Sequence, residues 1–159
     1  MISLMIKYEK FGADVINQLM QGPKDFKLVV WLMVLAVGES IFVVKICSIV
    51  SPIMPGSILD NDALVYAFFE MSLLARVVVV ALIPSFCEEL IFRGVITKRL
   101  AQSYSEVKSI VLSAILFSAF HLSLVQMIPT FLGGLLLGFV YIRTKNIYYA
   151  ILLHFFTIS

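Results

Sequence analysis

Charged residues are scarce in this chain, and their scarcity argues against a water-soluble globular protein. Only 14% of the 159 residues are charged, whereas 61% are hydrophobic. Typical soluble domains are about 45–50% apolar, and a domain of this size cannot bury so much apolar surface. An α-helix satisfies its backbone hydrogen bonds within itself, so it can pass through a bilayer that offers no water. The composition therefore indicates an integral membrane protein of the all-α class.

The chain also has few cysteines, a small net charge and no serine-hydrolase motif. The two cysteines, Cys47 and Cys87, lie inside apolar runs without C-x-x-C spacing, so we interpret them as small buried hydrophobic residues. The net charge of +2 is too small to indicate nucleic acid as a partner. No G-x-S-x-G sequence occurs, which disfavours a serine hydrolase of that type.

The chain divides into three parts, and the first two occupy residues 1–62. Residues 1–27 mix apolar and charged positions and lack the long apolar core of a secretory signal. They predict a short interfacial helix that ends at Gly22 and Pro23. Residues 28–62 comprise a first membrane span and an acidic loop, 51–62.

Residues 63–159 form the membrane core in this interpretation, and prolines and basic residues set the limits of its segments. The first apolar stretch is longer than the roughly 20 residues that one span needs, and Pro84 is expected to kink it. Pro129 is expected to end the next span. The last segment is too short to cross a membrane, so the chain is truncated there or its end is re-entrant. The predicted segments are 63–92 with a weak continuation to 100, 109–128, a short one at 130–142, and one from 147 onward.

Basic and acidic residues alternate between successive loops. Basic residues precede the first span and occur again in 98–108 and in 143–145, whereas 51–62 holds acidic residues and no basic one. Loops rich in lysine and arginine tend to stay in the cytoplasm. We therefore predict that the three basic segments are cytoplasmic and that 51–62 lies outside.

Two charged residues lie within the first span, at about 28–50. Glu39 and Lys45 are six residues apart, which is not the spacing of a helical ion pair. We expect Lys45 to extend toward the membrane interface. Glu39 either faces a neighbouring helix or contributes to a functional site.

The run Glu88-Glu89-Leu90-Ile91-Phe92-Arg93 is the most informative polar feature of the chain. A charge at membrane depth costs at least about 2.5–3.5 kcal/mol and marks a functional site by default. Glu89 and Arg93 are four residues apart, so one helical face carries both and they are expected to pair. The pairing leaves Glu88 free for chemistry.

Both histidines of the chain, His121 and His154, lie in apolar runs. At about 1.5 Å per helical residue, His121 lies roughly 18 Å, His154 roughly 12 Å and Glu88 roughly 16 Å from the predicted cytoplasmic ends of their helices. These similar depths predict one cavity open to the cytosol. In such a cavity a glutamate suits the general base that deprotonates water. A histidine could share the water or stabilise an oxyanion.

Taken together, E-E-x-x-x-R, F-x-x-x-H and a later histidine resemble the motifs of the CPBP family. This family comprises the CAAX-prenyl-protease and bacteriocin-processing intramembrane endopeptidases, also called Abi proteins, and is related to the Rce1-type protease. The resemblance covers residues 81–159. Its motif positions in this sequence are Glu88, Glu89, Arg93, Phe117, His121 and His154.

The resemblance implies a multi-span helical bundle with a conical cavity that faces the cytosol. Glu88 would activate water together with His121, without a covalent intermediate. Arg93 would orient Glu89, and His154 would help to stabilise the oxyanion. No cofactor is implied, and a zinc ion held by these glutamates and histidines is the alternative. The partners would be a peptide or membrane-protein substrate and the lipid bilayer, with the protein multi-pass in a bacterial cell membrane.

Two positions depart from the family pattern, and they leave other functions open. Thr157 and Ile158 stand where the family usually has an asparagine, about one turn after the third histidine. The first hypothesis is an active peptidase in bacteriocin maturation or self-immunity. The second is a weak or inactive immunity protein that binds a peptide or a receptor, and the third is a fragment of an ion-coupled transporter. The sequence reveals neither the substrate nor the oligomeric state, and the glycine-rich stretch 133–138 could pack within the bundle or against a second copy.

Overall fold

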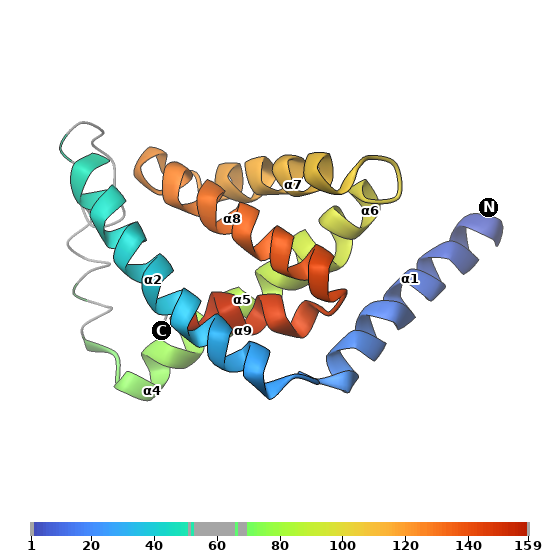
Figure 1. Ribbon diagram of the computed structural model, residues 1–159, viewed down its shortest axis with the longest axis horizontal. Helices are drawn as coiled ribbons and strands as arrows, with labels where there is room; N and C mark the ends of the chain where they lie inside the picture. Colours follow the sequence, from blue (N-terminus) through green and yellow to red (C-terminus); the bar gives the residue numbers. More distant parts are fainter. Residues whose placement is uncertain (1, 51, 53–65, 67–69, 159) are drawn as a thin grey trace.

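The described part of the chain consists of helices joined by short turns (Figure 1). The computed structural model describes residues 2–50, 52, 66 and 70–158, and no strand occurs among them. The all-α prediction is confirmed for these residues. The elements are α1 (Ile2–Gln21), α2 (Phe26–Val50), α4 (Leu73–Arg76), the π-helix η2 (Val77–Leu82), α5 (Ile83–Glu89), the π-helix η3 (Leu90–Thr97), α6 (Lys98–Leu100), α7 (Glu106–Phe120), α8 (Leu124–Thr144) and α9 (Ile147–Ile158).

Gly22 and Pro23 separate the first two helices, as the sequence predicts. Gly22 has a φ of +58°, a conformation that glycine adopts without steric cost. Asp25 then caps α2, because its side-chain oxygen accepts hydrogen bonds from two backbone N–H groups in the first turn. The predicted span at 28–50 coincides with α2 to within two residues. The acidic loop 51–62 lies almost wholly outside the described residues.

Two described helices, α2 and the Val125–Thr144 part of α8, are long and apolar enough to cross a membrane. Most side chains of α2 are exposed, including those of Val30, Trp31, Val34, Val37, Ile41 and Val44. Each Å² of exposed apolar surface costs roughly 25 cal/mol in water, so this face fits a lipid environment. With 12 residues, α9 is too short to span, as predicted.

The segment that carries the acidic pair is one continuous helical run from α4 to α6. η2 ends at Leu82, two residues before Pro84, whose missing N–H leaves a carbonyl of the preceding turn without its α-helical partner. The hydroxyl of Ser85 donates to the carbonyl oxygen of Ala81 at 2.6 Å, which adds a bond in the same turn. The structure has a π-helical stretch in the turn before Pro84, and the kink predicted at this proline stays a prediction. The predicted beginning of this segment, at 63, lies outside the described residues.

The predicted boundary at Pro129 is wrong, and so are the predicted segments 109–128 and 130–142. The turn lies earlier, between α7 and α8, where Leu122 has a φ of 51°. Ser123 then caps α8 by accepting a hydrogen bond from the N–H of Gln126. Pro129 lies inside α8, near its beginning. The fourth segment is consequently a full-length helix of 21 residues rather than a short one.

The glycine-rich stretch of α8 packs within the molecule, against α7. A Cβ atom at Gly134 would lie 3.1 Å from Ala114 Cα, and one at Gly138 would lie 3.1 Å from Ile110 Cγ2. Small residues at these positions let the two helices approach closely. From the sequence, the glycine-rich stretch could pack within the bundle or against a second copy of the chain. The structure shows that Gly134 and Gly138 pack within the molecule.

The short helix α9 lies at the centre of the described helices and contacts α1, α2, α5 and α8 (Figure 1). Ile147, Ala150 and Leu153 of α9 are fully buried. From α2, Leu32 and Ala36 belong to the same hydrophobic core. A helix that is buried on most sides needs apolar residues around its circumference, which explains the mostly apolar sequence of this segment, in which His154 and Thr157 are polar exceptions.

The three basic segments gather at one end of the described structure, as the predicted topology requires (Figure 1). Lys98 lies 3.5 Å from Asp14 of α1, and Lys145, after α8, lies 3.6 Å from Glu106 at the beginning of α7. Asn146 also donates a hydrogen bond to the carbonyl oxygen of Gly22. The segments therefore share one side, and its assignment to the cytoplasm stays a prediction.

Candidate functional site

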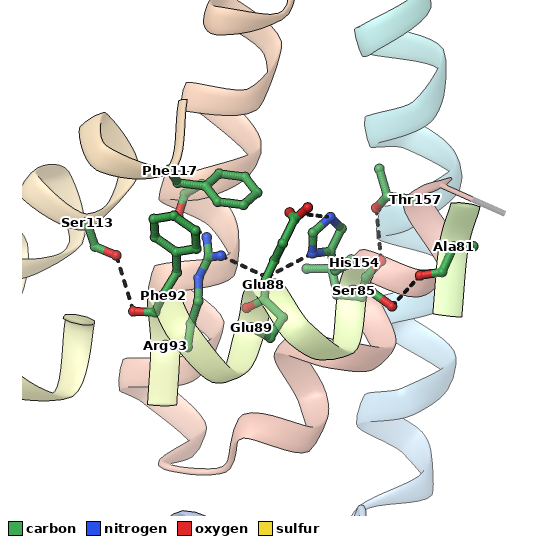
Figure 2. A network of polar contacts seen from close by, with 12 residues as sticks. Ala81, Ser85, Glu88, Glu89, Phe92, Arg93, Ser113, Phe117, His154 and Thr157 are labelled. Carbon is green, nitrogen blue, oxygen red and sulfur yellow. Dashed lines mark hydrogen bonds and ion pairs between the residues drawn. The ribbon is translucent and has the colours of Figure 1, made fainter. Parts of the chain in front are cut away.

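A buried ion pair lies at the centre of the site, on the helical run formed by α5 and η3. Glu89 and Arg93 are both fully buried, and Arg93 Nη1 donates to Glu89 Oε1 at 2.7 Å, as the four-residue spacing predicts (Figure 2). Arg93 Nη2 donates to the carbonyl oxygen of Gly134 at 3.1 Å. The guanidinium also lies over the ring of Phe117, 4.6 Å from its centroid. The arginine thus links η3 to both α7 and α8.

His154 of α9 lies between the two glutamates. Its Nδ1 is 2.8 Å from Glu89 Oε1, and its Nε2 is 3.9 Å from Glu88 Oε2 (Figure 2). A carboxylate only accepts hydrogen bonds, so Nδ1 carries the proton that is donated to Glu89. In the neutral ring, Nε2 is then an acceptor that faces Glu88. The pairing of a histidine with a carboxylate fixes both the tautomer and the orientation of the ring.

The side chain of Glu88 is the less buried of the two glutamates, with 20% of its surface exposed. Figure 2 shows its carboxylate beside the ring of His154. Its Oε2 is nevertheless buried and, among the described residues, has no hydrogen-bond partner. Glu89 Oε2 and Arg93 Nε of the same cluster are likewise buried without a hydrogen-bond partner among the described residues.

His121 lies at the end of α7 rather than inside a helix. Its Nδ1 lies 2.9 Å from the carbonyl oxygen of Phe117, and the two rings pack edge to face at 4.9 Å. Phe117 in turn packs on His154, with ring centroids 5.8 Å apart. Within the described residues, no hydrogen bond or ion pair joins His121 to Glu88 or Glu89. The structure therefore places His154, and not His121, against the acidic pair.

A cavity of about 330 Å³ adjoins His154 and is lined by residues of α2, α7, α8 and α9. This volume is at the lower end of the range that is typical of small-molecule sites. The two histidines share the cavity, as their predicted depths require, whereas Glu88, which was predicted to open into the same cavity, is not among its lining residues. Its lining residues include His121, His154, Glu39, Thr157, Gln126, Thr130, Phe117, Cys47, Leu137 and Ile158.

The prediction that both cysteines are buried is wrong for Cys87, which is exposed. Successive residues of a helix are about 100° apart, so Cys87 lies about 200° around α5 from the buried Glu89. It therefore faces away from the ion pair. Cys47 of α2 is partly buried and lines the cavity.

Glu39 is a residue of the cavity whose role the sequence left undecided. Its Oε2 accepts a hydrogen bond of 3.1 Å from the hydroxyl of Thr157. Gly133 makes room for the carboxylate, since a Cβ atom there would lie 2.7 Å from Glu39 Oε1. The sequence did contain a signal for this residue. A glutamate inside a membrane span has a high free-energy cost, and Glu39 has no basic residue at helical spacing to offset its charge, so a functional role is expected.

The donor atoms of the site do not fit a metal ion. Within the described residues, no three histidine, cysteine, aspartate or glutamate side chains form a group that could hold one. A catalytic zinc site supplies three protein ligands. In this site Glu89 Oε1 already accepts hydrogen bonds from both Arg93 and His154. The absence of a metal from the reaction stays a prediction.

Comparison with known proteins identifies the family. The model of the type II CAAX prenyl endopeptidase, Rce1-like, matches residues 70–157, which is more than half of the chain. No curated protein and no solved structure matches the chain. The match includes the acidic pair, both histidines and Thr157, whereas α1 and α2 precede it. The family implies an intramembrane endopeptidase that acts on a peptide substrate, and the two apolar helices fit an integral membrane protein. The chain belongs to the Rce1-like family of type II CAAX prenyl endopeptidases.

Proposed function

We propose that the chain hydrolyses peptide bonds within the membrane with a water molecule that is activated by the carboxylate of Glu88. The observation that supports this proposal is the separation of 3.9 Å between Glu88 Oε2 and His154 Nε2. Both atoms are hydrogen-bond acceptors when the glutamate is ionised and the histidine neutral. The separation allows one water to lie about 2.8 Å from each atom and to donate a proton toward each.

The reaction then uses groups that are already in place. Glu88 removes a proton from the water, the hydroxide attacks the carbonyl carbon, and the proton passes to the leaving amine as the peptide bond breaks. His154 holds the water through Nε2 while its bond to Glu89 keeps the ring oriented. Arg93 balances the charge of Glu89, which would otherwise be buried alone. The products are a carboxylate and an ammonium group, which together hold both protons of the water, and no covalent intermediate forms.

His121 is the residue that we propose for stabilising the tetrahedral oxyanion, a role that the resemblance gave to His154. The Nδ1 of His121 is engaged with the carbonyl oxygen of Phe117, so Nε2 is the nitrogen that remains for a substrate. Its imidazolium form would donate a hydrogen bond to the oxyanion. Gln126 lines the same cavity and supplies a second side-chain donor, an amide NH₂ group.

The membrane arrangement that accompanies this mechanism is a multi-span bundle whose cavity opens toward the cytosol. The collection of the basic segments at one end supports a common cytoplasmic side. Within this arrangement, we propose that the chain matures a bacteriocin or another membrane-associated peptide, or protects the producing bacterium from one.

A second candidate function is an immunity protein that binds a peptide without cleaving it. The observation that favours it is the engagement of Thr157, whose hydroxyl contacts both Glu39 Oε2 and the carbonyl oxygen of Leu153. A hydroxyl that donates to Glu39 is not free to stabilise an oxyanion. Removal of one such donor from an active site can cost about 10²–10³ in rate.

The experiment uses purified protein in lipid nanodiscs with a library of internally quenched peptides. We expect wild-type protein to cleave a subset of the library, and Glu88→Gln to lower the rate on these peptides by at least about 10³. The matched control is Glu106→Gln, which changes an exposed glutamate at the far end of α7 and is expected to leave cleavage unchanged. Cleavage at the wild-type rate by folded Glu88→Gln protein would overturn the proposal. Protection against a bacteriocin that survives Glu88→Gln would favour the second function.

A further inference from the structure

Helix α2 brings a carboxylate into the cavity from outside the part of the chain that matches the family model. The match covers residues 70–157, whereas Glu39 lies in the middle of α2. Two hydrogen bonds hold α2 against α9 at this level. The hydroxyl of Ser40 donates to the carbonyl oxygen of Thr157 at 2.8 Å, and the hydroxyl of Thr157 donates to Glu39 at 3.1 Å. The position of the carboxylate is therefore fixed by backbone and side-chain contacts.

Helix α8 leaves space for the carboxylate of Glu39, and no lysine or arginine in the described part of the chain forms an ion pair with it. Its Oε1 occupies the space left by the missing side chain of Gly133, and its Oε2 accepts the hydrogen bond from Thr157. No lysine or arginine occurs among the described residues that line the cavity. Arg93 lies near enough to interact electrostatically, but its guanidinium donates to Glu89 and to Gly134.

The surroundings of the cavity carry more negative than positive charge. Among the described residues of this cluster, Glu39 is the carboxylate that lines the cavity, Glu88 and Glu89 lie outside its lining, and the one guanidinium, that of Arg93, is paired with Glu89. Low-dielectric walls strengthen the field of such a cluster at the positions that a ligand would occupy. An apolar cavity with surplus negative charge favours a ligand that carries a positive charge.

Glu39 also lies where two hollows of the structure meet. A second hollow of about 450 Å³ lies between α2 and α8, and its other lining residues are apolar, among them Val34, Phe42 and Leu136. Glu39, Val43, Pro129 and Gly133 line both hollows. A peptide chain that occupies the cavity and extends into the second hollow must therefore pass this carboxylate.

We propose that Glu39 determines substrate specificity by accepting a lysine or arginine side chain of the peptide. The ammonium or guanidinium group binds Glu39 Oε1, while the neighbouring residues of the peptide contact the apolar walls. The proposal rests on the proposed peptidase function, since it names the class of peptide that enters the same cavity. It assigns Glu39 to substrate binding and not to the hydrolytic step.

The test compares peptides that differ only in lysine against norleucine, which keeps the alkyl chain and removes the charge. We expect wild-type protein to prefer the lysine peptide by at least about tenfold in kcat/KM, and Glu39→Gln to bring this ratio close to 1. Glutamine keeps an acceptor for Thr157, so the variant preserves the contact between α2 and α9. Glu39→Lys is expected to reverse the preference toward a glutamate peptide. The control Glu106→Gln keeps the wild-type ratio.

Binding of the same labelled peptides to Glu88→Gln protein separates this proposal from the proposed function. If wild-type protein cleaves nothing but Glu88→Gln protein binds the lysine peptide more tightly, and Glu39→Gln abolishes that difference, the specificity proposal stands and the peptidase function fails. If cleavage occurs with no preference for lysine, or with a preference that Glu39→Gln retains, the specificity proposal is overturned and the peptidase function stands. If wild-type protein cleaves no peptide and Glu88→Gln protein binds none, the specificity proposal and the peptidase function are both overturned.

Discussion

Replacement of Arg93 by methionine is expected to destabilise the protein strongly, because it leaves a carboxylate buried without its counter-charge. Both side chains of the Glu89–Arg93 pair are completely buried, and the donor and acceptor atoms are 2.7 Å apart. Removal of one partner from a buried ion pair typically costs about 3–5 kcal/mol. Methionine has a flexible apolar side chain of similar volume, although a shorter one, so a cavity contributes little to this loss. We therefore expect Arg93→Met to lower the free energy of unfolding by about 3–5 kcal/mol.

A second substitution separates the effect of the stranded charge from the loss of contacts. Glu89→Gln added to Arg93→Met removes the buried charge but keeps an acceptor for Nδ1 of His154. We expect the double variant to lie within about 1–2 kcal/mol of the wild type, since neutral partners of similar shape replace a charged pair with little loss. The control is Lys145→Met, which breaks an ion pair of 3.6 Å whose side chains are 67% and 60% exposed. Such exposed pairs contribute about 0–1 kcal/mol.

The free energy of unfolding is measured by circular dichroism during titration of detergent-solubilised protein with sodium dodecyl sulfate. A loss of less than about 1 kcal/mol in Arg93→Met would show that the buried pair does not stabilise the fold in the manner argued here. A double variant as unstable as the single one would refute the reasoning about the stranded carboxylate. In that case the contact with Gly134 or the packing on Phe117 would account for the role of the arginine.

Three further predictions concern the packing of α8 on α7, a buried hydrogen bond and the metal dependence of cleavage. Gly134→Ala is expected to destabilise the protein by about 1–3 kcal/mol, because the new Cβ lies 3.1 Å from Ala114 Cα. Gly38→Ala, which meets nothing within 4 Å, is the helical control and is expected to be neutral or slightly stabilising in the same unfolding assay. Ser113→Ala removes the buried acceptor 2.7 Å from Thr97 Oγ1 and is expected to cost about 1 kcal/mol, measured likewise. Treatment of active protein with a strong zinc chelator is expected to leave the cleavage rate unchanged, whereas a loss that added zinc restores would assign a metal to the reaction.

Local contacts of the site could be predicted from the sequence because they depend only on helical geometry. Glu89 and Arg93 are four residues apart, and a helix places them side by side whatever surrounds it. The limits of α2 follow from its apolar composition and from the turn at Gly22 in the same way. The similar depth of the two histidines also followed from counting residues along helices, and they share one cavity.

Contacts between distant segments could not be predicted in this way. The bond between His154 and Glu89 joins residues on α9 and α5, and residue spacing along the chain contains no information about it. The hydrogen bond between Thr157 and Glu39 is of the same kind. Sequence reasoning assigned Glu39 no definite role because it lies on a helix whose partner was unknown. The packing of α2 against α9 places Glu39 beside Thr157 and in the lining of the cavity.

The turn after α7 escaped prediction for a local reason. Pro129 is the usual signal that ends a helix, but it is the sixth residue of α8, and the helix continues through it. Membrane helices tolerate such a proline because neighbouring groups can satisfy the backbone carbonyl that it leaves without a partner. The real boundary depends on Leu122, which adopts a φ of 51° although leucine rarely does so. Nothing in the sequence marks that residue as a turn. The serine that follows it was the available signal, since Ser123 caps α8.

The measurement that tests the central claim most directly is a double-mutant cycle for Glu88→Gln and His154→Ala, read as the single-turnover rate of peptide cleavage. If both residues hold the same water, each substitution removes the same activated nucleophile. The account then predicts a double variant no slower than the slower single variant, within about a factor of ten. Rate losses that multiply in the double variant would show that the two residues act independently, and this would contradict a shared water between Glu88 and His154.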